Sequence, residues 1–559
     1  MGLNIPGLIA TVAFYVAVLA TGIWASRRAK AKVTTGTVTE VALLGGRSIS
    51  LPVGIFTMTA TWVGGGFILG VAEAVYSPQK GFVWALMPFY YSVSFIIGGL
   101  VFAKPMREKK YITMMDPFQI KYGKRVATLM VIPGIIVDVL WVACTLMALG
   151  GTMSTILDLP YAYSVVLSAA VAILYTLLGG LYSVAYTDVI QLVLIFIALW
   201  LCVPFILLNP ISLDISWTAV NHTYQPPWIG HVETQDIGKF LDDFLALSVG
   251  ALGFQCFHQR TLSASSPVKA QITCFVAAVM IIILGIPSIL IGAVAASTDW
   301  NLTDYGAPSP FERGEAYGVL PICLQYLAPP YVSIVGIAAV AAAVMSSTDS
   351  GLISSTSMFS SNIYKNIRKQ ASDREMQWVI RIAVVVTGVL GTALTFLDNS
   401  ILGFWILGAD VGYCIVLPQL ICVIFCPVSN GYGATAGYFL GILLRVLSGE
   451  PLIGLPPTIH FPGGEIVDGV YIQQAPVRTV SMLFTLVCVL FFSYVFEQLF
   501  HHHILPDRWD VLGVSNVTSP RLEQASNNNT DGQTVSMMSG PDKGHLERHR
   551  AKVDENTKL

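Results

Sequence analysis

Two short polar runs interrupt stretches of the chain that are otherwise apolar and long enough to cross a membrane. The first, at 57–66, reads TMTATWVGGG, and the second, at 346–350, reads SSTDS. A bilayer tolerates hydroxyls and a carboxylate only where protein, water or an ion satisfies them. Three consecutive glycines inside a span free backbone carbonyls that need a lined cavity. Together the two runs predict an ion site and a substrate site at mid-membrane depth.

The serine-rich run has the oxygen donors of a hard-cation site. On a helix, Ser346 and Ser350 share a face, and Asp349 lies three residues after Ser346. Hydroxyl, carbonyl and carboxylate oxygens are the ligands that hard cations such as Na⁺ prefer. The alternative is a polar cap at a cytoplasmic helix end, since Ser, Thr and Asp cap helices well. The apolar run 332–345 places the cluster a turn or more from that end, which favours the ion site.

Aromatic residues also fall inside the apolar runs. Trp62 adjoins the glycine step, Tyr90 and Tyr91 lie within the third apolar run, and Trp141 lies within the fourth. Membrane tryptophans usually sit at interfaces, whereas aromatic faces around a cavity are how proteins hold a quaternary ammonium. For any one of these rings, ordinary packing is the favoured alternative.

A second glycine step, Gly250–Gly253, interrupts the seventh apolar run, five runs after the first step. Paired breaks at corresponding positions of two halves are typical of inverted-repeat transporters that bind substrate between them.

Five acidic residues lie in or beside apolar runs. Asp188, at the start of a run, is by itself typical of a helix cap or dipole partner. The other four could compensate a cationic substrate or pair within the structure, and spacing does not choose between these roles: Asp138, Asp242, Asp243 and Asp410.

The composition is that of a polytopic membrane protein. The 559 residues are 54% hydrophobic and only 11% charged, against roughly a quarter charged in soluble domains. The net charge of −2 gives no information about nucleic acid, and because the sequence has no basic face that would bind it, we expect no nucleic-acid partner. A phosphate-binding glycine loop, HExxH and a spaced Ser-His-Asp set are missing from the sequence, so we expect no enzyme.

We count about thirteen candidate spans of about 20 residues, at 5–25, 48–72, 81–103, 126–150, 161–181, 188–209, 237–257, 271–295, 318–350, 378–397, 401–424, 431–449 and 479–500.

Basic residues predict the topology. With an extracellular N-terminus and an odd number of spans, the clusters at 27–32, 104–125, 260–269 and 365–381 all become cytoplasmic, as does the C-terminus. The sequons at Asn221 and Asn301 then lie outside, as N-glycosylation requires. Residues 1–506 are expected to form a transmembrane symporter domain, and the polar residues 507–559 a disordered cytoplasmic tail.

Several segments resemble the sodium/solute symporter family, and within it the branch that carries choline. The resemblance covers roughly the first 500 residues. The run around Trp62 is more specific to that branch than the Gly-Gly-Arg segment is. The matching segments are 45–47, 56–66, 103–107, 116–119, 179–188, 296–301 and 341–350.

The resemblance implies an all-α membrane protein with a leucine-transporter-type 5+5 inverted-repeat core, formed by spans two to six and seven to eleven. It implies a Na⁺ site, a second Na⁺ site found in some relatives, and an aromatic choline cage. Phe254 departs from the Trp of the choline branch, which weakens the π-face and removes the indole N–H. The implied first site is Ala60, Val63, Ala343, Ser346 and Ser347; the second is Asp188, Asp349 and Ser350 with Ser346; the cage is Trp62, Tyr91, Trp141 and Phe254.

The function implied by the resemblance is sodium-coupled, chloride-dependent, high-affinity uptake of choline across the plasma membrane by alternating access, supplying acetylcholine synthesis. A presynaptic vesicular pool is a further implication, but the tail lacks the acidic dileucine-type signal expected for it. Two alternatives stay open. One is a symporter of the same fold for proline, a sugar or a monocarboxylate, and the other is a channel or sensor without coupling.

Overall fold

The computed structural model describes residues 38–514 except 158, 180, 398, 399, 468 and 469, together with scattered positions between 9 and 24. About half of the predicted first span, 5–25, and all but the first eight residues of the predicted tail lie outside the described residues. The chain divides into two compact units, Met1–Phe496 and Glu497–Leu559. The described part of the second unit holds the last turns of a long helix and the short helix η11 (Asp507–Trp509).

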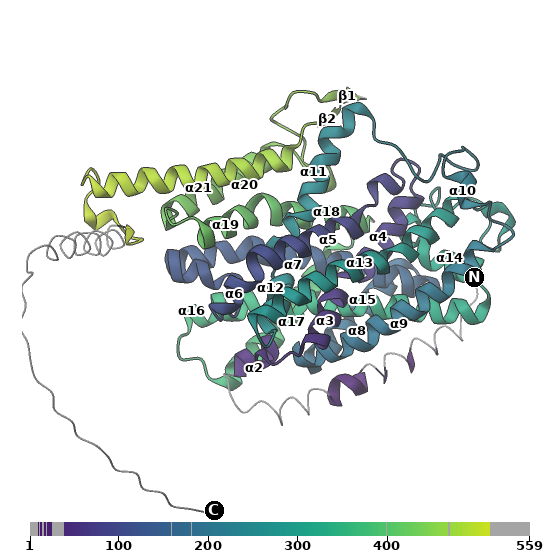
Figure 1. The fold of residues 1–559 in the computed structure, drawn as a ribbon, viewed down its shortest axis with the longest axis horizontal. Helices are drawn as coiled ribbons and strands as arrows, with labels where there is room; N and C mark the ends of the chain where they lie inside the picture. Colours follow the sequence, from purple (N-terminus) through teal and green to yellow (C-terminus); the bar gives the residue numbers. More distant parts are fainter. Residues whose placement is uncertain are drawn as a thin grey trace, which may run out of the picture. The chain divides into compact units, whose positions relative to one another are not determined.

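The regular secondary structure of the described residues is helical apart from one antiparallel hairpin, β1 (Glu465–Val467) with β2 (Val470–Ile472). Most of the long helices run along one direction in Figure 1. The longer helices are α3 (Leu51–Trp62), α4 (Gly65–Tyr76), α5 (Met87–Ile97), α7 (Asp116–Leu157), α8 (Tyr161–Gly179), α9 (Leu181–Leu207), α11 (Ile237–Ser248), α12 (Gln255–Ser263), α13 (Pro267–Ala296), α14 (Val319–Leu327), α15 (Pro330–Met358), α17 (Asp373–Leu394), α18 (Ile401–Val411), α19 (Leu417–Phe425), α20 (Gly431–Leu447) and α21 (Val477–His501). Shorter elements are α2 (Val38–Leu44), α6 (Lys104–Glu108), α10 (Ile215–Thr218), α16 (Lys365–Ile367), η3 (Gly98–Ala103), η5 (Gly250–Gly253), η8 (Phe359–Tyr364) and η9 (Gly412–Val416).

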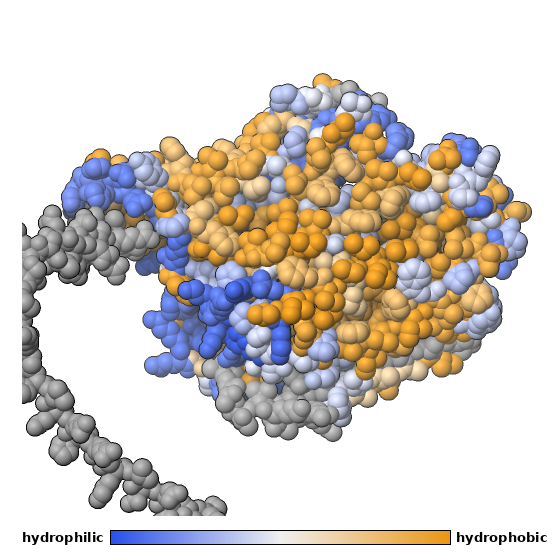
Figure 2. Space-filling view, viewed as in Figure 1, coloured by the Kyte–Doolittle hydropathy of each residue, from blue (hydrophilic) through white to orange (hydrophobic). Residues whose placement is uncertain are grey.

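Eight helices in the described part of the chain are long and apolar enough to cross a membrane, and two bent helix pairs raise the number to ten. The apolar helices α8 and α20 are shorter and correspond to the fifth and twelfth predicted spans. Figure 2 shows apolar side chains covering the flanks of the helices. The all-α polytopic fold is therefore confirmed.

Two details of the predicted spans are wrong. The ninth, 318–350, contains two helices, α14 and α15, because Pro329 and Pro330 interrupt it and the polar run is then followed by further helix up to Met358. Asp188 does not start a helix, since α9 begins at Leu181. Both differences place the polar residues deeper inside the bundle than the sequence indicated.

The helix ends follow local sequence rules. Ser266 caps α13 by accepting from the N–H of Lys269 at 3.2 Å, with Pro267 in the first helical position. Ser372 and Glu375 form a reciprocal capping box at the start of α17. These caps fix where the chain leaves each loop, and so which side chains face the interior.

Both predicted glycine steps are breaks in the structure. α3 and α4 meet at 47°, and the segment Thr234–Gly253 meets α12 at 48°. A Cβ on Gly64 would lie 1.6 Å from Oγ of Ser347, and one on Gly253 would lie 2.7 Å from the carbonyl oxygen of Gly412. Each break therefore packs directly on a neighbouring helix, the first on α15 and the second on η9.

The predicted cytoplasmic clusters at 104–125, 260–269 and 365–381 meet at one end of the bundle, whereas the cluster at 27–32 lies outside the described residues. Arg107 donates to the carbonyl of Ala264 at 2.7 Å, and Arg47 donates to the carbonyl of Lys110 at 2.7 Å. Hydrophilic residues gather in Figure 2 over the end where Figure 1 labels α6 and α16. Arg260 is the exception within its cluster, because it is buried inside the bundle.

Candidate ion and substrate site

The hydroxyls of α15 face the first helix break. Ser346 Oγ donates to Oδ1 of Asp188 at 2.5 Å and lies 3.4 Å from the carbonyl oxygen of Ala60. Ser347 Oγ donates to the carbonyl of Thr61 at 2.9 Å. All of these side chains are buried. The break thus supplies carbonyl oxygens and α15 supplies hydroxyls, which together suit a small hard cation.

The five residues predicted for the first Na⁺ site converge here. Val63 occupies the break itself, between the end of α3 and the start of α4. A Cβ on Gly64 would lie 3.4 Å from the carbonyl oxygen of Ala343, so this carbonyl also approaches the break. Ala60, Ser346 and Ser347 complete the set through the contacts above.

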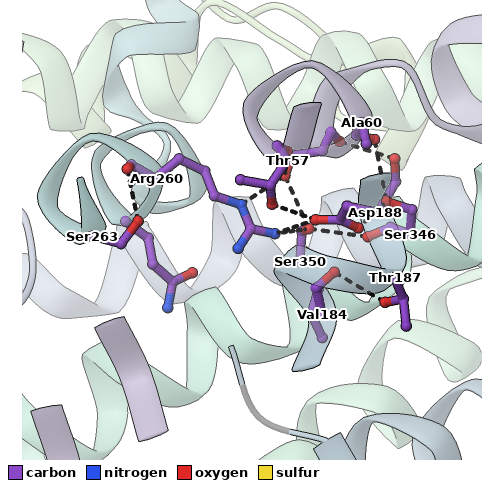
Figure 3. A network of polar contacts seen from close by, with 12 residues as sticks. Thr57, Ala60, Val184, Thr187, Asp188, Arg260, Ser263, Ser346 and Ser350 are labelled. Atoms are coloured by element: carbon purple, nitrogen blue, oxygen red, sulfur yellow. Dashed lines mark hydrogen bonds and ion pairs between the residues drawn. The ribbon is translucent and has the colours of Figure 1, made fainter. Parts of the chain in front are cut away.

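Arg260 enters the same cluster from α12 (Figure 3). Its Nη2 lies 3.4 Å from Oδ2 of Asp188 and donates to Ser350 Oγ at 2.6 Å. Its Nε donates to Thr61 Oγ1 at 2.9 Å. Thr57 Oγ1 also donates to Oδ2 of Asp188. The carboxylate of Asp188 therefore has a fully buried guanidinium as counter-charge, and a cation arriving here would share Asp188 with it.

The residues predicted for the second Na⁺ site make two separate sets of contacts. Asp188, Ser346 and Ser350 belong to the Arg260 network. Asp349 faces α8 instead, where its Oδ1 accepts from Thr176 Oγ1 at 2.5 Å. Asp349 is thus buried in the same region, on a different face of α15.

The aromatic residues predicted as a cage form one buried cluster. The Trp62 ring lies 4.6 Å from that of Tyr91, 5.3 Å from Trp141 and 5.7 Å from Phe254, centroid to centroid. Trp62 ends α3 and Phe254 joins η5 to α12, so each helix break carries one ring. Trp405 on α18 completes the cluster, 5.4 Å from Tyr91.

The spacing of these rings bears on what they can hold. A cation about 5 Å from two ring faces at right angles requires centroids about 7 Å apart. The measured separations of 4.6 to 5.7 Å between Trp62 and the three other predicted rings are shorter. A quaternary ammonium would therefore have to part the rings.

The ring cluster and the hydroxyl cluster are adjoining. The indole Nε1 of Trp141 donates to the carbonyl of Ser347 at 3.4 Å. Ser347 in turn contacts the break that begins directly after Trp62. Movement of α15 relative to the break would consequently reach both clusters at once.

Two residues of this region were missed in the sequence analysis. Trp405 lies within an apolar run, where a single ring is indistinguishable from a packing residue. Arg260 was counted as the first residue of the predicted cytoplasmic cluster 260–269. Its position shortly after Gln255, the first residue of the helix that follows the second break, was the signal that could have indicated a buried arginine.

The remaining acids have structural partners. Asp138 accepts from Ser354 Oγ at 2.7 Å. Asp410 on α18 accepts from Arg445 on α20 at 2.7 Å. At the start of α21, the N–H of Arg478 donates to Asp242 at 2.9 Å and its guanidinium pairs with Asp243. These contacts favour the structural role for the four acids.

Replacing Gly64 with Ala is expected to sharply reduce the amount of folded protein, because its Cβ would fall 1.6 Å from Ser347 Oγ. Such overpacking costs about 1–3 kcal/mol or more. The measurement is the monodisperse fraction of detergent-extracted protein on size exclusion. Gly318→Ala is the matched control, since the nearest atom to its Cβ is 3.7 Å away. The double change Gly64→Ala/Ser347→Gly should recover part of the loss; equal yields for both single variants would contradict the close approach.

The fold with two broken spans is similar to that of a solved membrane protein. A solved Na⁺-coupled sialic acid symporter, in a substrate-bound outward-open state, has a similar fold, with a TM-score of 0.65 over 88% of this chain and 98% of that chain at 16% identity. Residues 43–441 match the family described as sodium:solute symporter family. This chain belongs to the sodium:solute symporter family.

Curated relatives are similar along almost the whole chain. The high affinity choline transporter 1 of Homo sapiens is 48% identical over 91% of this chain and 88% of its own length. The high-affinity choline transporter 1 of Torpedo marmorata is 47% identical over 96% of this chain and 94% of its own length. The chain is thus a multi-span membrane transporter by family.

Proposed function

We propose that this chain imports choline across the plasma membrane by coupling its entry to that of Na⁺. The observation that carries the proposal is the buried ring cluster of Trp62, Tyr91, Trp141 and Phe254 at the two helix breaks, in contact with the hydroxyl cluster through Trp141. Aromatic faces suit a quaternary ammonium, which cannot donate a hydrogen bond. The names of the relatives in human and Torpedo support the same substrate.

In the proposed cycle Na⁺ binds first. The carbonyls of Ala60, Val63 and Ala343 with the hydroxyls of Ser346 and Ser347 hold it, and thereby hold α15 against the break between α3 and α4. Choline then docks on the rings at that break, and the two repeats rock around the filled site. Both solutes are cations, so the inside-negative potential contributes about 2.3 kcal/mol per charge per 100 mV.

The finer parts of the proposal concern ions and placement. Asp188, Asp349 and Ser350 are proposed as contributors to a second Na⁺ site, and transport is proposed to require Cl⁻. The N-terminus is proposed to be extracellular and the C-terminus cytoplasmic. A neuronal chain of this kind would supply choline for acetylcholine synthesis, with a presynaptic vesicular pool as the corresponding location.

The decisive experiment is uptake of radiolabelled choline by cells expressing the chain, with Na⁺ replaced by Li⁺ and, separately, Cl⁻ by gluconate. Saturable uptake that disappears without Na⁺ is expected, with a further loss without Cl⁻. Unlabelled proline, glucose and lactate should not compete. Competition by one of them in place of choline would assign another solute, and non-saturable, Na⁺-independent flux would indicate a channel.

Changing Asn221 or Asn301 to Gln is expected to remove one N-glycan each. Asn301 is exposed in η6 (Trp300–Leu302), and His222, next to Asn221, lines the same surface hollow as Asn301, so the two sequons share a face. Each variant should migrate faster on a gel, and the double variant should match glycosidase-treated protein. A wild-type band that the glycosidase does not shift would contradict the proposed outside position.

A further inference from the structure

A hollow of about 380 Å³ lies at the predicted cytoplasmic end, where α7 approaches α16. Three lysines line it: Lys124 of α7, Lys365 of α16, and Lys369 just after α16. Gly123, with φ of +83°, bends the chain immediately before Lys124. This bend starts the long part of α7 at the rim of the hollow, with a lysine as its first residue.

The charge of the lining is net positive. Asp116 is the one acidic residue among the described residues that line the hollow, and its oxygens are engaged within the wall. They accept from the N–H of Ile112 at 2.6 Å, Thr113 Oγ1 at 3.0 Å and Asn362 Nδ2 at 2.9 Å. Three ammonium groups against one carboxylate that is already hydrogen-bonded leave an excess of about two positive charges for an anion.

The neutral polar lining has a free donor. The buried Oγ of Ser361 has no hydrogen-bond partner among the described residues, and Ser361 lines the hollow. Ammonium groups bind phosphate oxygens well, and a side-chain rotation of Ser361 would allow its hydroxyl to donate to one of them. The chemistry of the hollow therefore fits a ligand with more than one phosphate.

Apolar residues at the rim distinguish a membrane lipid from a soluble anion. Ile120 lines the hollow with 73% of its surface exposed, and Ile367, which does not line it but lies between Lys365 and Lys369 in the sequence, is 80% exposed. Exposed isoleucines beside lysines, at the end of helices that span a bilayer, suit the boundary between acyl chains and headgroups. Clusters of basic residues on the cytoplasmic side bind anionic headgroups.

We propose that this hollow binds the phosphorylated headgroup of an anionic membrane lipid of the phosphoinositide class. The headgroup would bridge α7, which carries Trp141, and the continuation of α15, which carries Ser346. These elements already touch at this point, where Asn362 Nδ2 in η8 donates to Oδ1 of Asp116, the first residue of α7, at 2.9 Å. Lipid binding would therefore stabilise the pair of helices on which both clusters of the central site depend.

The test uses the purified full chain in detergent, with its melting midpoint followed during titration with dioctanoyl phosphatidylinositol 4,5-bisphosphate. The midpoint should rise with this lipid and not with dioctanoyl phosphatidylcholine. Lys124→Gln/Lys365→Gln/Lys369→Gln should raise the half-maximal lipid concentration roughly a hundredfold, at about fivefold for each lysine. Lys365→Gln alone should raise it about fivefold, which keeps the test usable if the triple variant is unstable.

The matched control is Lys104→Gln/Lys109→Gln/Lys269→Gln, which removes three lysines of the same end that do not line the hollow. It should respond to the lipid as the wild type does. An equal response of the two triple variants would overturn the proposed site. Soluble inositol trisphosphate is the second arm: a midpoint rise as large as that with the lipid, at equal concentration, would overturn the assignment to a membrane lipid.

Discussion

Trp62→Ala is expected to abolish saturable choline uptake while the protein still reaches the cell surface. Trp62 is a ring that contacts each of the other three predicted cage residues, at 4.6 to 5.7 Å from Tyr91, Trp141 and Phe254. A desolvated cation–π contact is worth about 2 kcal/mol, or about thirtyfold in affinity. The neighbouring rings would also lose the surface that orients them. The measurement is initial uptake against choline concentration, corrected for biotinylated surface protein.

Two controls separate the loss of the π-face from the loss of packing. Trp62→Phe keeps an aromatic face and should retain saturable uptake at reduced affinity. Phe95→Leu removes a ring that contacts Trp62 at 5.8 Å but lies outside the predicted cage, so it should leave affinity close to that of the wild type. Normal uptake by Trp62→Ala would refute the cage. Equal losses of affinity in Phe95→Leu and Trp62→Phe would show that the rings matter only for packing.

Asp188→Asn is expected to eliminate Na⁺-stimulated uptake and to lower surface expression as well. The change leaves Arg260, which is 1% exposed at its side chain, without its ion-pair partner. Breaking a buried pair by removing one member costs about 3–5 kcal/mol. The measurements are the Na⁺ activation curve of choline uptake and the biotinylated surface fraction.

The double variant Asp188→Asn/Arg260→Gln distinguishes a structural from an ion-binding role. Removing both charges relieves the unpaired guanidinium, so surface expression should recover. Na⁺ activation should not recover if the carboxylate contributes to the cation site through Ser346, to which it is hydrogen-bonded at 2.5 Å. Full recovery of Na⁺ activation in the double variant would make Asp188 a partner of Arg260 alone.

The fold was predictable because its signals are local. Apolar length identifies spans, and Gly64 and Gly253 mark breaks because no side chain fits where each contacts a neighbouring helix. The misassigned ninth span shows the limit of this approach. A hydropathy window continues across Pro329 and Pro330, whereas the backbone ends one helix and begins another there.

The candidate site was predictable only in part. The residue types of the serine-rich run indicated the chemistry, and the resemblance supplied the pairing of that run with the first break. The ion pair of Arg260 with Asp188 joins residues 72 positions apart on helices that periodicity cannot place next to one another. Trp405 is in the same category, because only packing of α18 against α7 brings it to Trp141, 6.4 Å away.

Two arginines, on α20 and α21, limit how far the chain can be shortened from its C-terminal end. Arg445 and Arg478 come from spans that follow the predicted ten-helix core, yet they neutralise Asp410 on α18 and Asp242 and Asp243 on α11. A chain truncated after α19 would leave these three carboxylates without counter-ions. Unpaired charges in a low-dielectric surrounding strongly destabilise the fold. The last two spans therefore supply the positive charges that pair with these three carboxylates of the predicted ten-helix core.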